Sequence, residues 1–381
     1  ECQEQFQAAI DLSLSTLALL GNPLPKNPSP LRVIVTVLAF MKRAKKLSDE
    51  HWLSLPIMTD PLKLAAMEIH GIFFSLVFVC DGTERLLPLC AIRMLQVTLR
   101  HGLSFAAPFA MAALAMVASN MEDIDTACRF ANLATKLSNL TFVGKNWQAR
   151  TANLVTSFAI HWSSPFSQLL PTYVSNYQYA LSTGDIVAAM HLASALVSLQ
   201  GLASCTLEQK LQSCKAVLQV MFDYSNFAWQ EPVLTELQGC LNLMGETEDP
   251  FVLRGESFDE ATALDSIMLQ FRITATKTVI CVHLRNWDEG LTLTKRYRAT
   301  KEKIACFFAH SHLITFAALV CHEQYRATMK RKYISWARSY ERHLEKLSSR
   351  GALNASAFLL LLRAESAVYK ADAIECKRLY E

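Results

Sequence analysis

The residues best suited to chemistry in this sequence are a cysteine and two histidines in its C-terminal third. Cys306, His310 and His312 lie close together, and Cys321 and His322 follow. Residues four positions apart share one helix face, so a thiolate and an imidazole at this spacing can bind Zn²⁺. Cys321 and His322 are neighbours, however, and neighbouring side chains on a helix point apart. Because the surroundings are apolar, we expect core residues here and no metal ion.

Catalytic motifs are missing from the sequence. Its 12 glycines form neither a phosphate-binding loop nor a dinucleotide-binding fingerprint, and Gly144-Lys145 has no upstream glycine partner. The nucleophile elbow, the zinc-protease motif and the kinase motifs are also absent. His343 lacks the residues that usually follow a phosphoacceptor histidine, which favours a solvated helix face. The sequence therefore predicts no enzyme in this chain, no cofactor and no small-molecule substrate.

A basic region offers a surface for a partner. Between Lys295 and Arg350 there are 13 Lys or Arg residues against 4 Asp or Glu residues, with tyrosines and a tryptophan interleaved. Three interpretations stay open, namely a solvated surface, a site for an acidic protein, and a site for nucleic acid, which we expect least. The candidate partner residues are Lys295, Arg296, Arg298, Lys330, Arg331 and Lys332.

The elements that must position these residues are helices. Half of the chain (51%) is hydrophobic, while glycine and proline number only 12 each, too few for a β-protein with a tight turn after every strand. No segment alternates in the β manner. A formal charge of +3 implies neither a nucleic-acid footprint over the whole chain nor an acidic disordered tail. We therefore expect an all-α fold.

Cysteine usage and hydropathy bear on the cellular location. The 11 cysteines form no C-x-x-C pair and no regular framework, which indicates reduced core residues. The longest apolar stretch, Leu103 to Ala118, contains Ser104 and Pro108 and is shorter than the roughly 20 residues that span a bilayer. We expect a cytoplasmic chain without a membrane partner. Because the first residue is Glu, we also expect a fragment of a longer protein.

Repeats organise the predicted helices. Asp123 begins a pattern in which Ala127 and Ala134 leave room for a partner helix and Phe130 fills the gap, as in the first helix of a tetratricopeptide-type hairpin. Gly184-Asp185 repeats this opening, at an irregular interval. The pattern predicts an α-solenoid of irregular tetratricopeptide-like helical hairpins.

One segment interrupts the helices. Residues 246–259 are acidic and contain Pro250 and Gly255, which predicts a long inter-helical loop and a hinge. We therefore divide the chain into a helical-repeat segment (1–245), this loop (246–259) and a continuation of the repeats (260–381).

Several strings resemble one family of very large signalling ATPases. They are Leu55-Pro56-x-Met58-Thr59-Asp60-Pro61, Ala149-Arg150-Thr151 followed by His161-Trp162, Tyr179-x-x-x-Thr183-Gly184-Asp185, and Leu241-Asn242-Leu243-x-Gly245 with Pro250, Gly255 and Asp259 beyond. To the motif residues of the repeats and of these strings we assign structural roles: Pro56, Thr59, Asp60, Pro61, Asp123, Ala127, His161, Trp162, Gly184, Asp185, Asn242, Gly245, Gly255 and Asp259.

The resemblance implies a place in a longer protein. In that family a protein-kinase-like domain precedes an AAA-type NTPase of the signal-transducing class, a tetratricopeptide-like helical region, a GAF sensor, and a histidine kinase or other output domain. This chain resembles the helical region alone. The resemblance thus implies a non-catalytic scaffold that binds a protein or adjoining domains and transmits a signal. The alternative is a nucleic-acid-binding α-solenoid that uses residues 295–350.

Overall fold

The fold is all-α, as predicted. The computed structural model describes residues 2–80, 82–140, 142–203, 205–225, 229–263, 266–300, 306–368 and 373–380. Within these ranges the regular elements are helices, and the only β-type pairs are the isolated bridges Ile57–Leu103 and Arg254–Asp259. The chain divides into two compact units, residues 1–159 with 179–185 (unit 1) and residues 160–178 with 186–381 (unit 2).

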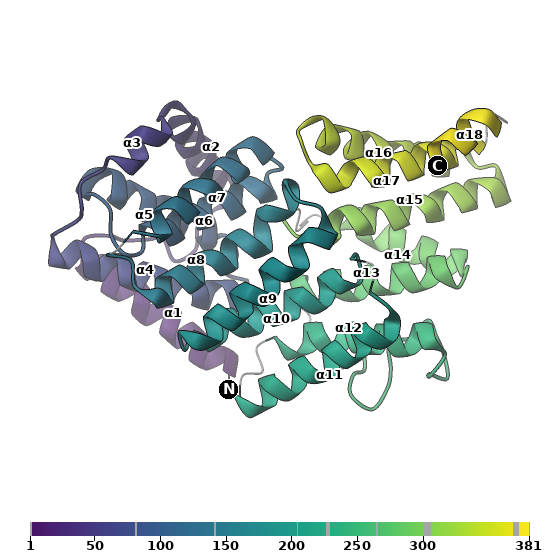
Figure 1. The fold of residues 1–381 in the computed structure, drawn as a ribbon, viewed down its shortest axis with the longest axis horizontal. Helices are drawn as coiled ribbons and strands as arrows, with labels where there is room; N and C mark the ends of the chain where they lie inside the picture. The colour runs from purple at the N-terminus through teal and green to yellow at the C-terminus, as the bar shows by residue number, and fades with distance from the viewer. Residues whose placement is uncertain are drawn as a thin grey trace. The chain divides into compact units, whose positions relative to one another are not determined.

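Unit 1 contains the first eight helices and the end of the ninth (Figure 1). Their bounds are α1 (Cys2–Leu19), α2 (Pro30–Lys46), α3 (Asp49–Leu53), α4 (Pro61–Val79), α5 (Leu86–His101), α6 (Ala107–Asn120), α7 (Ile124–Ser138), α8 (Lys145–Phe158) and α9 (Phe166–Ser182).

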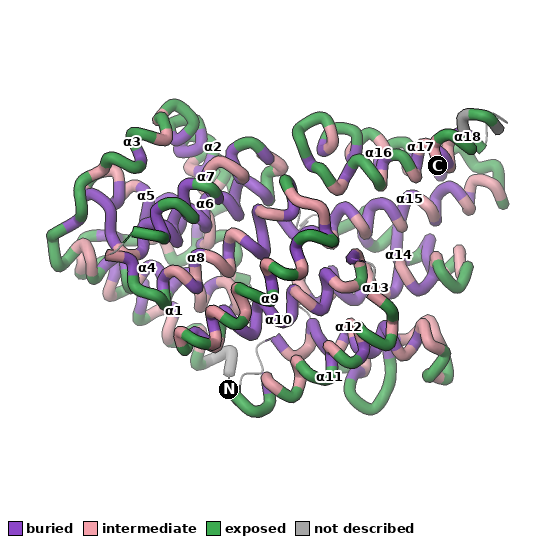
Figure 2. The backbone as a smooth tube through the Cα atoms, viewed as in Figure 1, coloured by how far each residue is buried: buried purple, intermediate pink, exposed green. Residues whose placement is uncertain are grey.

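The core of unit 1 is built around α6. Every residue of this helix from Ala107 to Ser119 is buried (Figure 2), and α5, α7 and α8 pack against it. Five of its side chains from 110 to 118 are alanines, which let the neighbouring helices approach closely. The buried Ala127, Phe130 and Ala134 of α7 face this core, which agrees with the small and large positions expected from the repeat pattern.

Helix α4 is long and apolar enough to cross a membrane by length and composition alone. In unit 1 it packs against α1, α5 and α6, with Met67, Phe73 and Phe74 buried. The Leu103–Ala118 stretch singled out above is not one helix, because Leu103 pairs with the loop before α4 and α6 begins only at Ala107. The absence of a membrane partner stays a prediction.

The motif residue Asp60 caps the start of α4. The side chain of Asp60 accepts hydrogen bonds from the backbone of Leu62 (2.9 Å) and Lys63 (3.3 Å), and Pro61 takes the first helical position. Upstream, the carbonyl of Pro56 accepts from the Leu103 amide at 2.7 Å. Gly102 makes this pairing feasible, because its φ is +101° and a Cβ there would collide with that carbonyl.

Unit 2 holds the remaining helices: η1 (Ile160–Trp162), most of α9, α10 (Ile186–Gln200), α11 (Leu207–Asp223), α12 (Gln230–Met244), α13 (Ile267–His283), α14 (Trp287–Ala299), α15 (Ala309–Thr328), α16 (Arg331–Ser349), α17 (Leu353–Val368) and α18 (Ala373–Tyr380). From α10 onward each helix packs against the next, and α10, α13 and α15 also contact the helix after that. Stacked helical hairpins require such neighbour contacts. The solenoid arrangement of the whole chain stays a prediction.

The predicted loop lies within unit 2 and is tightly held. The Asn242 side chain donates to the carbonyls of Pro250 (3.0 Å) and Val252 (2.7 Å), and that of Gln238 donates to the Arg254 carbonyl (3.1 Å). The Leu253 side chain is buried with Leu269 and Ile273 of α13. The motif residue Asn242 thus replaces backbone partners that an irregular loop lacks. Whether the segment acts as a hinge stays a prediction.

Replacing Asn242 should destabilise unit 2. In Asn242→Ala the buried carbonyls of the loop lose their donor, which should lower the free energy of unfolding by about 2–3 kcal/mol. Urea denaturation followed by circular dichroism measures this. The matched control Asn132→Ala, on the exposed face of α7, should change stability by less than about 0.5 kcal/mol. Equal stability of the two variants would contradict the role of Asn242.

Candidate functional site

The predicted basic surface is formed by the end of α14 and the start of α16, both in unit 2. Lys295, Arg296 and Arg298 occupy the last turns of α14, where cations suit the negative end of the helix dipole. Lys330 is the N-cap residue of α16, and Arg331 and Lys332 follow it. All six side chains are exposed. The structure thus leaves each of them accessible to a partner.

An arginine and a tryptophan link the two parts of this surface. The guanidinium of Arg298 lies over the ring of Trp336 of α16, 4.6 Å from its centroid, and 5.6 Å from that of Tyr340. Arg296 donates to the side chain of Gln270 at 2.8 Å. Arg298 therefore joins the cations of α14 to α16. We call the six cationic residues and Trp336 together the basic surface.

The aromatic residues of the region are mostly in the core. Tyr297, Tyr333 and Tyr340 are buried, and Trp336 is half-buried beneath Arg298. Proteins that bind single-stranded nucleic acid stack the bases on open aromatic faces. The interleaved aromatics that suggested such binding therefore serve packing.

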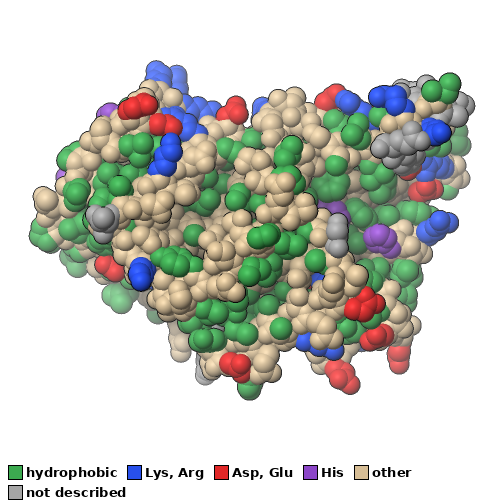
Figure 3. Space-filling model, in the orientation of Figure 1, with side chains coloured by type: hydrophobic (Ala, Val, Ile, Leu, Met, Phe, Trp, Pro, Cys, Tyr) green, Lys and Arg blue, Asp and Glu red, His purple; other side chains and the backbone are tan. Residues whose placement is uncertain are grey.

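Further along α16 the acidic side chains pair with α17. Glu345 pairs with Arg363 of α17 at 2.5 Å, and Glu341 lies 4.0 Å from the same guanidinium. Arg338 and Arg342 are exposed and form no ion pair among the described residues. Figure 3 shows Lys and Arg side chains gathered over α16 to α18, and Asp and Glu side chains where α12 and the following loop lie. Unit 2 is thus polarised in charge.

The histidine and cysteine cluster is part of the core of unit 2. Burial raises the pKa of the Cys306 thiol to about 12. Burial also lowers the pKa of His312 to about 4, and the positive charge of Lys210 lowers it further in the same direction. The ring of His312 lies 4.4 Å from that of Phe316. In the described part of the chain, no group of three ligand atoms within 4.8 Å of one another includes Cys306 or His312. These residues do not converge on a common point.

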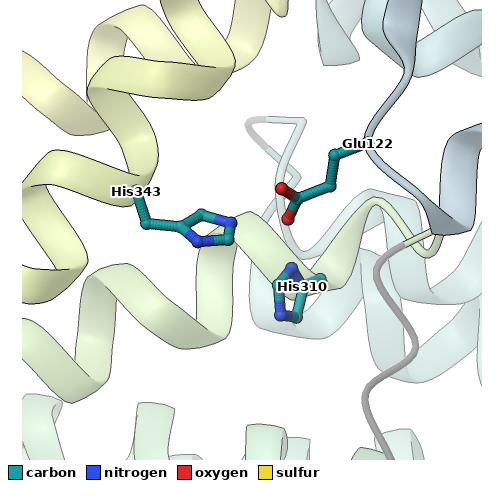
Figure 4. Close-up of side chains that lie close together, drawn as sticks. All are labelled: Glu122, His310 and His343. Atoms are coloured by element: carbon teal, nitrogen blue, oxygen red, sulfur yellow. The ribbon is translucent and has the colours of Figure 1, made fainter.

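His310 is held by hydrogen bonding. Its Nε2 atom lies 2.7 Å from the hydroxyl of Tyr297, and its ring centroid lies 5.9 Å from that of His343. Figure 4 shows the two histidines, which come from α15 and α16; Glu122, also drawn there, belongs to unit 1. His343 is half-buried rather than on an open helix face.

Motif residues that are distant in sequence meet in unit 1. Arg150 donates from Nε to Asp185 at 2.8 Å, and the Asp185 side chain is 7% exposed. Gly184, with φ of +75°, makes the turn that directs Asp185. Asp123, the N-cap residue of α7, pairs with Lys45 at 2.6 Å. These contacts join helices of unit 1.

The His161-Trp162 motif has a similar role in unit 2. Both side chains are buried, with ring centroids 4.5 Å apart. The side chain of Asn354 on α17 donates to the carbonyls of His161 (2.7 Å) and Ser164 (2.9 Å) and accepts from the Phe166 amide (3.1 Å). Asn354 therefore fastens the η1 turn to α17, a role that its position in a glycosylation sequon did not reveal.

An exposed apolar face on α2 was missed by the sequence analysis. Leu31 (70% exposed), Ile34 (54%), Val35 (56%) and Leu38 (52%) lie on one side of this helix, at helical spacing. Val37, Phe40, Met41 and Ala44 are buried against the rest of unit 1. The signal was present, because the apolar residues of the first half of α2 extend well beyond the side that is buried, and only Arg32 and Thr36 interrupt them.

The comparisons with known proteins add no identity. No family model matches the chain, and no curated protein matches it either. The roles of its residues must therefore be argued from their contacts.

Buried histidines should make stability depend on pH. Burial lowers the pKa of His70, His161 and His191 to about 3, so they stay neutral in the folded state down to that pH. In the unfolded state they bind protons below about pH 6.5. The unfolded state therefore binds more protons between these limits, and stability falls as pH falls, by about 2 kcal/mol per histidine from pH 6.5 to 5.

The variant His191→Gln should show a smaller loss of stability over this interval than the parent chain. Urea denaturation at both pH values measures it, and His51→Gln, at an exposed position of α3, is the control that should keep the full loss. A loss in His191→Gln as large as in the control would count against the buried neutral state of His191.

Proposed function

We propose that this chain is a non-catalytic interaction scaffold that binds another protein or an adjoining domain of a longer protein. The observation that carries the proposal is the apolar face of α2, formed by Leu31, Ile34, Val35 and Leu38. Contiguous exposed apolar faces are rare on monomeric proteins and mark interaction sites. Covering this one supplies a driving force for a protein partner.

The energetics fit a protein interface. Each of the four aliphatic side chains is more than half exposed, and burying one fully is worth about 1.5–3 kcal/mol. The opposite side of α2 is anchored by Phe40 and Met41, so the helix need not rearrange to bind. A rigid, spaced aliphatic row is what an amphipathic helix of a partner recognises.

The signalling context comes from the resemblance described above. In a large signalling ATPase, a helical region between the NTPase and the sensor would bind one of them and hold the output domain inactive until it rearranges. Each helix from α10 to α18 packs against the next, and contacts of this local kind allow small rotations between successive helices to accumulate along a stack. This supports transmission as well as binding.

The apolar face of α2 should be covered in the assembled protein. A photo-crosslinking amino acid in place of Val35 or Leu38, in the full-length protein in its own cells, should give a discrete adduct with one partner or domain, identified by mass spectrometry. The same amino acid in place of the exposed Asn132 of α7 is the control. Adducts no stronger at positions 35 and 38 than at 132 would refute an interface on α2.

A second candidate function uses the basic surface, and its geometry favours an acidic protein segment over nucleic acid. Exposed cations at Lys295, Arg331 and Lys332 attract acidic side chains and phosphates alike. The rings that would stack bases are buried, and Trp336 is covered by Arg298. What remains is a charged surface without a stacking platform. The nucleic-acid alternative predicts affinity that depends steeply on salt.

Fluorescence anisotropy should separate these partners. A peptide of twenty Glu and Asp residues should bind the full chain at 50 mM salt more tightly than single-stranded RNA of equal charge. The variant Arg331→Glu/Lys332→Glu should weaken peptide binding at least about tenfold, whereas Lys136→Glu/Lys215→Glu, with the same change of net charge, should not. Tighter RNA binding would favour the nucleic-acid function, and equal effects of the two variants would exclude a specific surface.

A further inference from the structure

A basic cleft lies in unit 1, where the loop after α1, the end of α2, the first turn of α4 and the second half of α5 come together. Its volume is about 390 Å³, within the range of small-molecule pockets. The Lys and Arg residues of its wall are Arg43, Lys63, Arg93 and Arg100, and in the described part of the chain no Asp or Glu lines it. We call this the basic cleft.

The four Lys and Arg side chains of the basic cleft differ from other cations of unit 1 in lacking a carboxylate partner among the described residues. Elsewhere in unit 1, Lys45 at the end of α2 pairs with Asp123, and Arg129 of α7 pairs with Asp49, each at 2.6 Å. Among the described residues, no carboxylate lies within ion-pair distance of the four Lys and Arg side chains of the cleft. Burial, and then the charge of Arg100, lower the pKa of Arg93. Uncompensated like charges in one cleft cost stability, which an anion would restore.

Helix capping is the competing explanation, because cations favour helix C-termini. Lys63 donates to the Leu20 carbonyl at 3.5 Å and Arg93 to the Gly21 carbonyl at 3.4 Å, both at the end of α1. These bonds are long, and the Nε atom of Arg93 is buried without a partner. Arg43 and Arg100 lie in the last turns of their own helices, α2 and α5, where the helix dipoles favour a cation. Helix capping does not account for the buried Nε atom of Arg93, which has no hydrogen-bond partner among the described residues.

We propose that the basic cleft binds a ligand that carries two or more adjacent phosphate groups. Guanidinium groups bind phosphate oxygens through paired N–H donors, and two arginines face the cleft from α5 and one from α2. Each phosphate carries up to two negative charges, so two of them balance the four cations. Gln96 and His101 add further polar side chains at the wall. A soluble diphosphate and a phosphorylated lipid headgroup share this chemistry.

Isothermal titration of the full chain with inorganic pyrophosphate, without divalent metal, tests the proposal. Saturable binding with one site is expected, weakening as salt rises. The exposed double variant Arg43→Gln/Arg100→Gln should lower the affinity at least about tenfold, since two charge-assisted contacts are lost. Arg93→Gln should do the same. The control Lys136→Gln/Lys215→Gln removes the same charge elsewhere and should bind as the parent chain does.

No pyrophosphate binding by the parent chain at millimolar concentration would overturn the proposal, as would equal weakening in the double variant and its control. Two further titrations then distinguish a soluble diphosphate from a lipid headgroup. One uses ADP, and the other uses vesicles of phosphatidylcholine with and without phosphatidylinositol bisphosphate. Tighter binding of ADP than of pyrophosphate assigns a nucleotide. Binding only to vesicles that carry the phosphorylated lipid, lost in Arg43→Gln/Arg100→Gln, assigns a headgroup.

Discussion

Close packing between helices is the constraint on which both units depend. Unit 1 is organised around α6, whose alanines let α5, α7 and α8 approach it on all sides. Gly71 of α4 shows how little space remains, because a Cβ at this position would overlap the ring of Trp147 on α8. Interiors of this density do not tolerate added volume. Functional variation is therefore confined to the outer faces of the helices and to the loops between them.

The helices of unit 2 are also closely packed, and they enclose a network of buried charges. Glu236 of α12 accepts from Lys210 of α11 at 2.6 Å and lies 3.8 Å from Arg272 of α13. Burial raises the pKa of Glu236, but Lys210 and Arg272 outweigh it and hold that pKa below its usual value. Removing one member would strand the others in the core, so the three helices are bound to one arrangement. This network stands in contrast to the basic cleft of unit 1, where the cations lack a carboxylate.

The sequence predicted the fold class and several helix ends, because these follow from local chemistry. Asp60 before Pro61 is a strong helix start, and the spacing of Ala127 and Phe130 places them in a helix interface. The contact of Arg150 with Asp185, and that of Asn354 with His161, could not be predicted, because they depend on how distant segments meet. The cleft was missed for the same reason, since Arg43, Lys63 and Arg93 are separated in sequence.

The residues of the motif strings have structural roles within each unit. Four motif residues bind backbone groups or an opposite charge within their own unit: Pro56, Asp60, Asp185 and Asn242. Each therefore specifies a turn or a helix contact. Residues of this kind indicate an architecture that a family shares. They do not identify a partner, because a partner reads the exposed faces, where α2 is aliphatic and α14 and α16 are basic. The recognition surfaces proposed for this chain therefore consist of residues that helix packing does not constrain.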